Sequence, residues 1–133
     1  MLALRLKVTF LGKKSIFVGP FGSLLRKFGG MPIERSNSNG VVGQLVCAFE
    51  DAETMVLGLA PEGTRRKTKQ WKTGFLIIAQ QAKIPIVPVS LDFSKKQVEF
   101  LAEHYITSDI AKELSHFKQQ FTAVCAKKPQ SVG

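Results

Sequence analysis

Apolar residues recur along the chain with two different periods, which together predict alternating strands and helices. Short apolar or alternating runs rich in β-branched and aromatic residues predict strands at 5–11, 55–60, 84–92 and 97–105. Apolar residues three and four positions apart predict helices at 20–28, 39–52, 73–82 and 108–124. A short extended piece at 31–34 joins the first two helices, and the run at 55–60 is apolar enough for a buried strand.

Residues that begin or interrupt secondary structure support these boundaries. A glycine pair beginning at Gly29 follows the first predicted helix. Thr73 and Ser108 stand where the N-caps of the third and fourth helices are expected. Pro85 and Pro88 remove two amide donors from the strand at 84–92, so this strand is expected to be irregular or at an edge.

The alternation of strands and helices predicts an α/β fold with a mostly parallel sheet flanked by helices. The chain has 133 residues, of which 44% are apolar and 22% are charged, as in one ordinary globular domain. We therefore expect a single domain over 1–126 and a frayed polar tail over 127–133. Cys47 and Cys125 lie far apart, which favours two reduced thiols in a cytosolic-side protein.

The net charge of +9 is concentrated in two stretches. Residues 1–35 hold seven Lys or Arg against Glu34, and residues 61–72 hold five against Glu62. Such an excess attracts nucleic acid, an anionic membrane or a phosphorylated small molecule. The chain carries no RNA-binding signature, which argues against nucleic acid, and no apolar run approaches the roughly 18–20 residues that span a bilayer.

Two short segments, 29–35 (GGMPIER) and 61–66 (PEGTRR), have the composition of phosphate sites. In each, an arginine follows a glycine-containing turn at the end of an apolar element. The planar guanidinium can donate two parallel hydrogen bonds to a phosphate, and glycine lets backbone amides come close. Either segment alone is a common surface turn, so the interpretation depends on their occurring together.

In order along the chain, these segments and their neighbours resemble the glycerolipid acyltransferase family, typified by the 1-acyl-glycerol-3-phosphate acyltransferases. The resemblance covers roughly residues 5–100 and is carried by FLGKKSIF at 10–17, GPFG at 19–22, FGGMPIERS at 28–36, APEGTR at 60–65, WKTGF at 71–75 and IVPV at 86–89.

The resemblance implies a role for five residues at the phosphate of the acceptor substrate: Arg35, Glu62, Gly63, Thr64 and Arg65. The two arginines would contact the phosphate, Gly63 would permit close approach, and Glu62 would orient its loop rather than act as a base. Pro88 matches a position that shapes the acyl-chain side of the site. Lys13 or Lys14 would add positive charge.

One family motif has no counterpart here. The family's first motif is His, four residues and Asp, with the histidine as general base, and it precedes the strand matched by 5–11. Only residues 1–4 precede that strand, so the first helix and its motif are expected to be missing from an N-terminally truncated chain. His104 and Asp109 have the same spacing but follow Pro88, and helix capping accounts for Asp109 without catalysis.

The resemblance implies transfer of a fatty acyl group to a lysophospholipid or glycerol-phosphate hydroxyl during phospholipid biosynthesis. The donor would be acyl-CoA or acyl-carrier protein, with no metal or other cofactor. The protein would act in the cytoplasm, peripherally at the inner face of an anionic membrane. Because the His-Asp motif is absent, we expect these residues alone to be inactive. The alternative is a non-catalytic module that binds lysophospholipid or anionic membrane. Acceptor, acyl-chain length, donor, oligomeric state and the origin of the truncation stay open.

Overall fold

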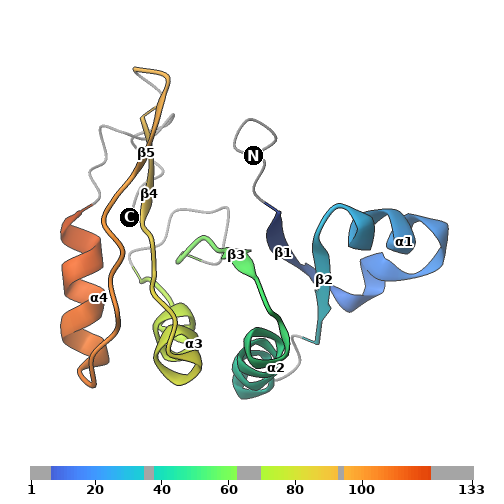
Figure 1. Ribbon diagram of the computed structural model, residues 1–133, viewed down its shortest axis with the longest axis horizontal. Coiled ribbons are helices and arrows are strands. Elements are labelled where there is room, and N and C mark those ends of the chain that lie inside the picture. The colour runs from blue at the N-terminus through green and yellow to red at the C-terminus, as the bar shows by residue number, and fades with distance from the viewer. Residues whose placement is uncertain (1–6, 35–37, 63–69, 93–94, 121–133) are drawn as a thin grey trace. The chain divides into compact units, whose positions relative to one another are not determined.

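The computed structural model describes residues 7–34, 38–62, 70–92 and 95–120. Their elements, in chain order, are β1 (Val8–Lys13), the 3₁₀-helix η2 (Lys14–Phe17), α1 (Gly19–Lys27), β2 (Gly30–Ile33), α2 (Ser38–Asp51), β3 (Val56–Gly58), α3 (Gly74–Ala82), β4 (Val89–Asp92), β5 (Gln97–Phe100) and α4 (Ile110–Gln119). The chain divides into two compact units, Met1–Leu59 and Ala60–Gly133. The first contains β1 to β3 and the second contains α3 to α4 (Figure 1).

The first unit is built on a parallel sheet with the strand order β2-β1-β3 (Figure 1). Phe10 on the central strand is level with both Gly30 and Gly58, and Lys13 is level with Ile33. Since all three strands run the same way, their carboxyl ends lie along one edge of the sheet. The predicted α/β fold with a parallel sheet and flanking helices is confirmed.

Three glycines pack closely against Phe17, a buried residue of η2: two lie against its ring and one lies against its backbone. A Cβ atom on Gly12 of β1 would lie 2.6 Å from Phe17 Cε2, and one on Gly30 of β2 would lie 2.8 Å from Phe17 Cε1. A Cβ atom on Gly22 of α1 would meet the backbone carbonyl of Phe17. No larger residue fits at these three positions without displacing the ring or the backbone.

The packing against Phe17 decides which face of α1 turns inward. Gly22 is the buried residue of α1, and Arg26, one turn later, places its guanidinium carbon 5.7 Å from the centre of the Phe17 ring. Phe21, Leu24 and Phe28 lie on the other side of the helix and are exposed. The apolar face of α1 is therefore directed away from the sheet.

A glycine pair lets α1 turn directly into β2. Gly29 has φ of 89°, a left-handed conformation that favours glycine, and its carbonyl accepts a hydrogen bond from the Phe10 amide at 3.0 Å. A Cβ atom on Gly29 would lie 2.7 Å from the Val8 carbonyl oxygen. The conformation and the close approach both require glycine, which explains the first half of the motif at 29–35.

The second unit combines α3 and α4 with an antiparallel β4–β5 hairpin (Figure 1). Its core contains Leu76, Ile78 and Ala79 of α3 and Phe117 of α4. The rings of Phe75 and Phe117 meet edge to face, with centroids 6.1 Å apart. None of the described helices combines the length and apolar character needed to cross a bilayer.

Two strands differ from those predicted from the sequence. The strand predicted at 84–92 becomes regular only at Val89, after its second proline, although Ile86 forms an isolated bridge with His104. The expectation of a buried strand at 55–60 was only partly right, because Val56 is exposed on β3. The predicted tail at 127–133 lies outside the described residues, and the single domain over 1–126 stays a prediction.

Two glycine-to-alanine substitutions test the packing around Phe17. Gly22→Ala places a methyl group against the Phe17 carbonyl and is expected to lower the free energy of unfolding by about 1–3 kcal/mol. Gly43→Ala is the matched control, because nothing lies within 4 Å of a Cβ atom at this position in α2. It is expected to raise the free energy of unfolding by about 0.5–1 kcal/mol. Urea denaturation followed by circular dichroism measures both changes, and equal effects would contradict the packing argument.

Candidate functional site

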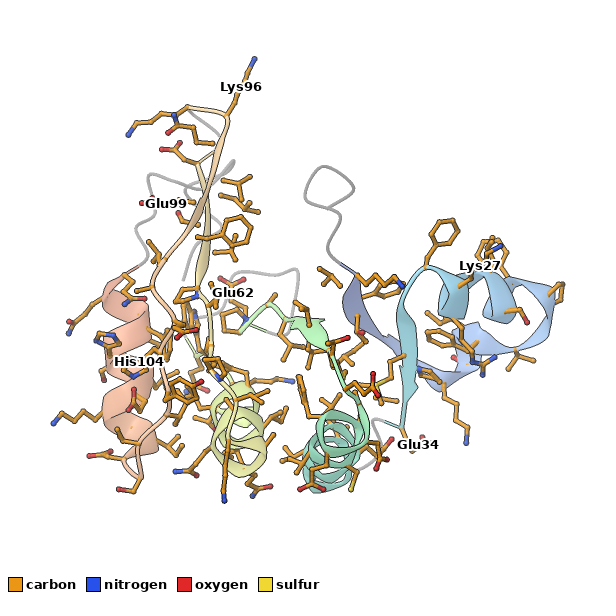
Figure 2. All side chains as sticks on the ribbon, in the orientation of Figure 1. Lys27, Glu34, Glu62, Lys96, Glu99 and His104 are labelled. Carbon is orange, nitrogen blue, oxygen red and sulfur yellow. The ribbon has the colours of Figure 1, made fainter. Side chains whose placement is uncertain are left out.

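The carboxyl edge of the parallel sheet carries the start of the predicted phosphate site. Ile33, the last residue of β2, is buried, and the exposed Glu34 follows it directly (Figure 2). Lys13 ends β1 beside Ile33 in the register and is also exposed. Arg35 comes next after Glu34 but lies outside the described residues. The strand order thus brings Ile33 and Glu34 to the edge of the sheet at which ligand loops lie in open α/β folds.

The segment with the Glu-Gly-Thr-Arg sequence leaves the same edge after β3. Gly58 ends β3, and Pro61 and Glu62 form a turn in which both are half-buried. Gly63, Thr64 and Arg65 lie outside the described residues.

A backbone hydrogen bond joins the two ends of this loop, since the Lys72 amide donates to the Pro61 carbonyl at 3.0 Å. Helix α3 begins just beyond, at Gly74. The predicted N-cap Thr73 accepts hydrogen bonds from Leu76 and Ile77 through its backbone carbonyl, without a side-chain cap. The loop is therefore closed at its base and leads into a helix N-terminus, where the helix dipole favours anions.

Pro88 is buried, and its surroundings fix its backbone. Its carbonyl accepts a hydrogen bond from the Leu101 amide at 2.9 Å. Two residues earlier, Ile86 and His104 exchange two backbone hydrogen bonds, each of 2.9 Å. The segment 86–88 is thus held by the chain that leads to His104. Its proposed role beside the acyl chain stays a prediction.

A buried carboxylate, Glu113 of α4, organises this second unit. Glu113 Oε1 accepts hydrogen bonds from the Thr107 amide at 2.9 Å and from the Thr107 hydroxyl at 2.6 Å, and Glu113 Oε2 lies 2.6 Å from His104 Nε2. The His104 side chain points toward α4 (Figure 2), where its ring stacks on His116 with centroids 5.0 Å apart. Gln80 of α3 donates to the Thr107 carbonyl at 2.7 Å, so the cluster joins α3, α4 and the segment between β5 and α4.

The pKa of Glu113 reflects a competition between burial and hydrogen bonding. Burial opposes the charged form and acts to raise the pKa. The two hydrogen bonds from Thr107, the bond with His104 and the charge of protonated His104 outweigh burial and lower the pKa from 4.5 to about 2. The carboxylate is therefore ionised at every pH at which the protein is expected to work.

His104 and Asp109, which match the spacing of the family's catalytic motif, have separate partners. Asp109 Oδ1 accepts a hydrogen bond from the Lys112 amide at 3.0 Å and caps α4, so the prediction that Ser108 is the N-cap was wrong by one residue. His104 pairs with Glu113 instead. The sequence did contain a signal for Glu113, since it falls three positions after Ile110 and four before Phe117, on the apolar face of the helix.

Comparison with known proteins identifies the family. The sequence model of the family described as Acyltransferase matches residues 1–92, more than half of the chain. The chain belongs to the acyltransferase family. It is 35% identical over 89 residues to a 1-acyl-sn-glycerol-3-phosphate acyltransferase of Cocos nucifera, and this match covers 63% of the chain and 29% of the acyltransferase from Cocos nucifera. The match therefore spans less than a third of that relative, and no solved structure matches significantly.

Substitution of Glu113 tests whether its carboxylate stabilises this acyltransferase fold. At neutral pH, Glu113→Gln is expected to lower the free energy of unfolding by about 1–3 kcal/mol, because charge-assisted hydrogen bonds are lost in a buried site. Glu103→Gln is the control, since Glu103 is exposed and its loss is expected to change stability by less than about 0.5 kcal/mol.

The pH dependence gives the same test a second readout. Because folding lowers the pKa of Glu113, its contribution to stability is complete above pH 4.5 and is lost as the pH falls toward about 2. The difference in thermal midpoint between the native chain and Glu113→Gln should therefore shrink over this interval. A constant difference, or one that the Glu103→Gln control shares, would contradict the assignment.

Proposed function

We propose that this chain forms the acceptor-binding part of an acyltransferase acting on a lysophospholipid or glycerol phosphate in phospholipid biosynthesis. The observation that carries the proposal is the Acyltransferase match over residues 1–92, which includes both arginine-bearing motifs. The similarity to an enzyme named for 1-acyl-sn-glycerol 3-phosphate supports a phosphorylated acceptor. The reaction would take place at the cytoplasmic face of a membrane.

The proposed chemistry is the transfer of an acyl group from a thioester, acyl-CoA or acyl-carrier protein, to a free hydroxyl. The hydroxyl oxygen forms a bond with the thioester carbonyl carbon, the carbon–sulfur bond breaks, and the thiolate takes up the proton that the hydroxyl loses. Arg35 and Arg65 hold the acceptor's phosphate through bidentate, charge-assisted hydrogen bonds. Gly63 and Thr64 bring backbone and hydroxyl donors to it, Glu62 orients the loop, and Pro88 shapes the acyl-chain side.

Deprotonation of the acceptor hydroxyl requires a general base. Among the 133 residues the histidines are His104 and His116, both well after Pro88 in the chain. His104 lies 2.6 Å from the Glu113 carboxylate, and both histidines pack against Phe117 of α4. We therefore propose that the 133-residue chain by itself binds the acceptor without transferring an acyl group. A module that binds lysophospholipid without turnover is the second candidate, and the same motifs support it.

Alanine substitutions at the two arginines test the acceptor site. Arg35→Ala and Arg65→Ala are each expected to weaken binding of lysophosphatidate by roughly ten- to a hundred-fold, because each removes charge-assisted hydrogen bonds worth about 1.5–3 kcal/mol. Lysine at either position should restore part of the affinity, since an ammonium lacks the planar fork. Lys118→Ala is the control for the loss of one positive charge, and calorimetric titration measures the parent chain and all five variants.

The dephosphorylated monoacylglycerol provides a second control in the same titrations. It should bind weakly to every variant, because it lacks the group that the arginines recognise. Equal losses in Arg35→Ala, Arg65→Ala and Lys118→Ala, or no preference for the phosphorylated ligand, would leave only nonspecific attraction to a basic surface.

Thioester release tests whether the purified chain catalyses acyl transfer. Incubation of the purified chain with acyl-CoA and lysophosphatidate is expected to release no CoA above the uncatalysed rate, since general acid–base catalysis alone is worth a factor of about 100 to 10,000. His104→Ala should behave like the parent chain. Turnover that disappears in His104→Ala would contradict the proposal and would give His104 a catalytic role.

A further inference from the structure

The apolar face of α1 is exposed although the helix packs against a folded sheet. Four residues form this face, here named the α1 stripe: Val18, Phe21, Leu24 and Phe28. Phe21 is 67% exposed, Phe28 is 70% exposed and Val18 is 75% exposed. Phe21, Leu24 and Phe28 are three and four positions apart, so they lie along one side of the helix. An apolar strip of this kind on a folded protein marks an interaction site.

The stripe faces outward because of how α1 is held. The opposite side of the helix is fixed by Gly22 against the Phe17 backbone and by Arg26 beside the Phe17 ring. Turning Phe21 and Phe28 toward the sheet would require rotating the helix about its axis. The rotation would move Gly22 away from the Phe17 carbonyl and bring a residue with a Cβ atom to a place where only glycine fits. The exposure of the stripe is therefore a property of the packing within the first unit.

The charges around the stripe are all positive. Residues 1–33 contain no Asp or Glu. Lys13 and Lys14 are exposed just before Val18, and Lys27, also exposed, follows Leu24 by one turn of the helix. Aromatic and aliphatic side chains bordered by lysines are the pattern of a helix that lies in the interface of an anionic bilayer. The lysine stems can also extend along the apolar surface to reach lipid phosphates.

We propose that α1 docks this protein on the surface of an anionic phospholipid bilayer, with the α1 stripe among the acyl chains and Lys13, Lys14 and Lys27 at the headgroup phosphates. This inference deepens the proposed function, on which it rests, because a lysophospholipid acceptor resides in such a bilayer. Lys13 also ends β1 at the edge that leads into Arg35, so docking through α1 brings the surrounding part of the first unit to the lipid phosphates.

Charge distinguishes this occupant from a second copy of the chain. A symmetric dimer built on the α1 stripe would bring the same lysines of both copies together, and like charges disfavour such a contact. Three exposed apolar side chains on the β4–β5 hairpin, Leu91, Val98 and Phe100, are accompanied by charges of both signs, including Asp92, Lys96 and Glu99. The hairpin therefore provides a matched control surface without the same electrostatic preference.

Vesicle flotation tests the proposal with the purified chain and no lysophospholipid present. The parent chain is expected to float with vesicles of phosphatidylcholine mixed with phosphatidylglycerol, and much less with phosphatidylcholine alone or at high salt. Phe21→Gln/Phe28→Gln should lower the partition coefficient by about a hundred-fold, roughly tenfold for each exposed ring. Val98→Gln/Tyr105→Gln is the control, because Val98 is 58% exposed and Tyr105 is 59% exposed, and it should bind like the parent.

Three further variants test the contribution of the lysine charges to binding and the depth at which α1 enters the bilayer. Lys14→Gln/Lys27→Gln should weaken binding to anionic vesicles by about tenfold, while Lys96→Gln/Lys112→Gln, which removes the same charge elsewhere, should have a smaller effect. Phe21→Trp should keep the affinity, and brominated lipids should quench its fluorescence beyond the quenching of Trp71 in the parent. These substitutions lie at exposed positions, and circular dichroism verifies that each variant is folded.

The outcomes distinguish this inference from the proposed function. Arg35→Ala should bind vesicles like the parent while losing affinity for lysophosphatidate, and the Phe21→Gln/Phe28→Gln variant should still bind glycerol 3-phosphate like the parent. Equal flotation of the Phe21→Gln/Phe28→Gln and Val98→Gln/Tyr105→Gln variants would overturn docking through α1. Sedimentation that shows a dimer in the parent and a monomer in the stripe variant, without vesicle binding, would assign the stripe to a second copy instead.

Discussion

The contact between Phe17 and its three glycines is the constraint on which the first unit depends. Gly12 of β1 and Gly30 of β2 approach the buried Phe17 ring, and Gly22 of α1 approaches the Phe17 backbone, more closely than any residue with a Cβ atom permits. The position of α1 beside β1 and β2 follows from that closeness, and the turn through Gly29, which lies close to the Val8 carbonyl, leads from α1 into β2. The same contact holds the start of β2 at Gly30 and turns the apolar face of α1 outward. Packing at Phe17 thus sets the proposed membrane surface and holds the strand that carries most of the first arginine-bearing motif, 29–35.

The second unit is organised by a polar contact instead. Glu113 is a carboxylate at a position that helical periodicity assigns to the core, and it is tolerated because Thr107 and His104 occupy both of its oxygens. The backbone of His104 in turn holds Ile86, two residues before Pro88. Glu113, which lies outside the family motifs, therefore supports through His104 the segment 86–89 that carries the last of those motifs. Acid should weaken this unit through Glu113 as the pH falls from 4.5 toward its pKa of about 2, whereas the contact of Phe17 with its three glycines contains no titratable group.

Much of the fold followed from hydrophobic period and from glycine and proline positions, which report local constraints. The parallel sheet, α1 and α2 were predicted in this way. The inward face of α1 was not predicted, because it depends on Gly22 meeting Phe17, a contact between elements that no single-helix pattern encodes. In the structure Asp109, and not the predicted Ser108, caps α4, because the Asp109 side chain reaches the Lys112 amide. Glu113 was missed because its partners, His104 and Thr107, precede the helix. The roles of Arg35, Arg65 and Pro88 came from the family resemblance and stay predictions.

The closeness of Gly12, Phe17, Gly22 and Gly30 along the chain has a consequence for the order of folding. Their contacts join neighbouring elements within residues 12–30, so little loop-closure entropy is lost when they form. Pairing of β1 with β3, by contrast, must bring Val8 to Val56. The segment from β1 to β2 is therefore the natural nucleus of the first unit, onto which β3 is added late. In a growing polypeptide, this nucleus would be complete before β3, and before any part of the second unit, has been synthesised.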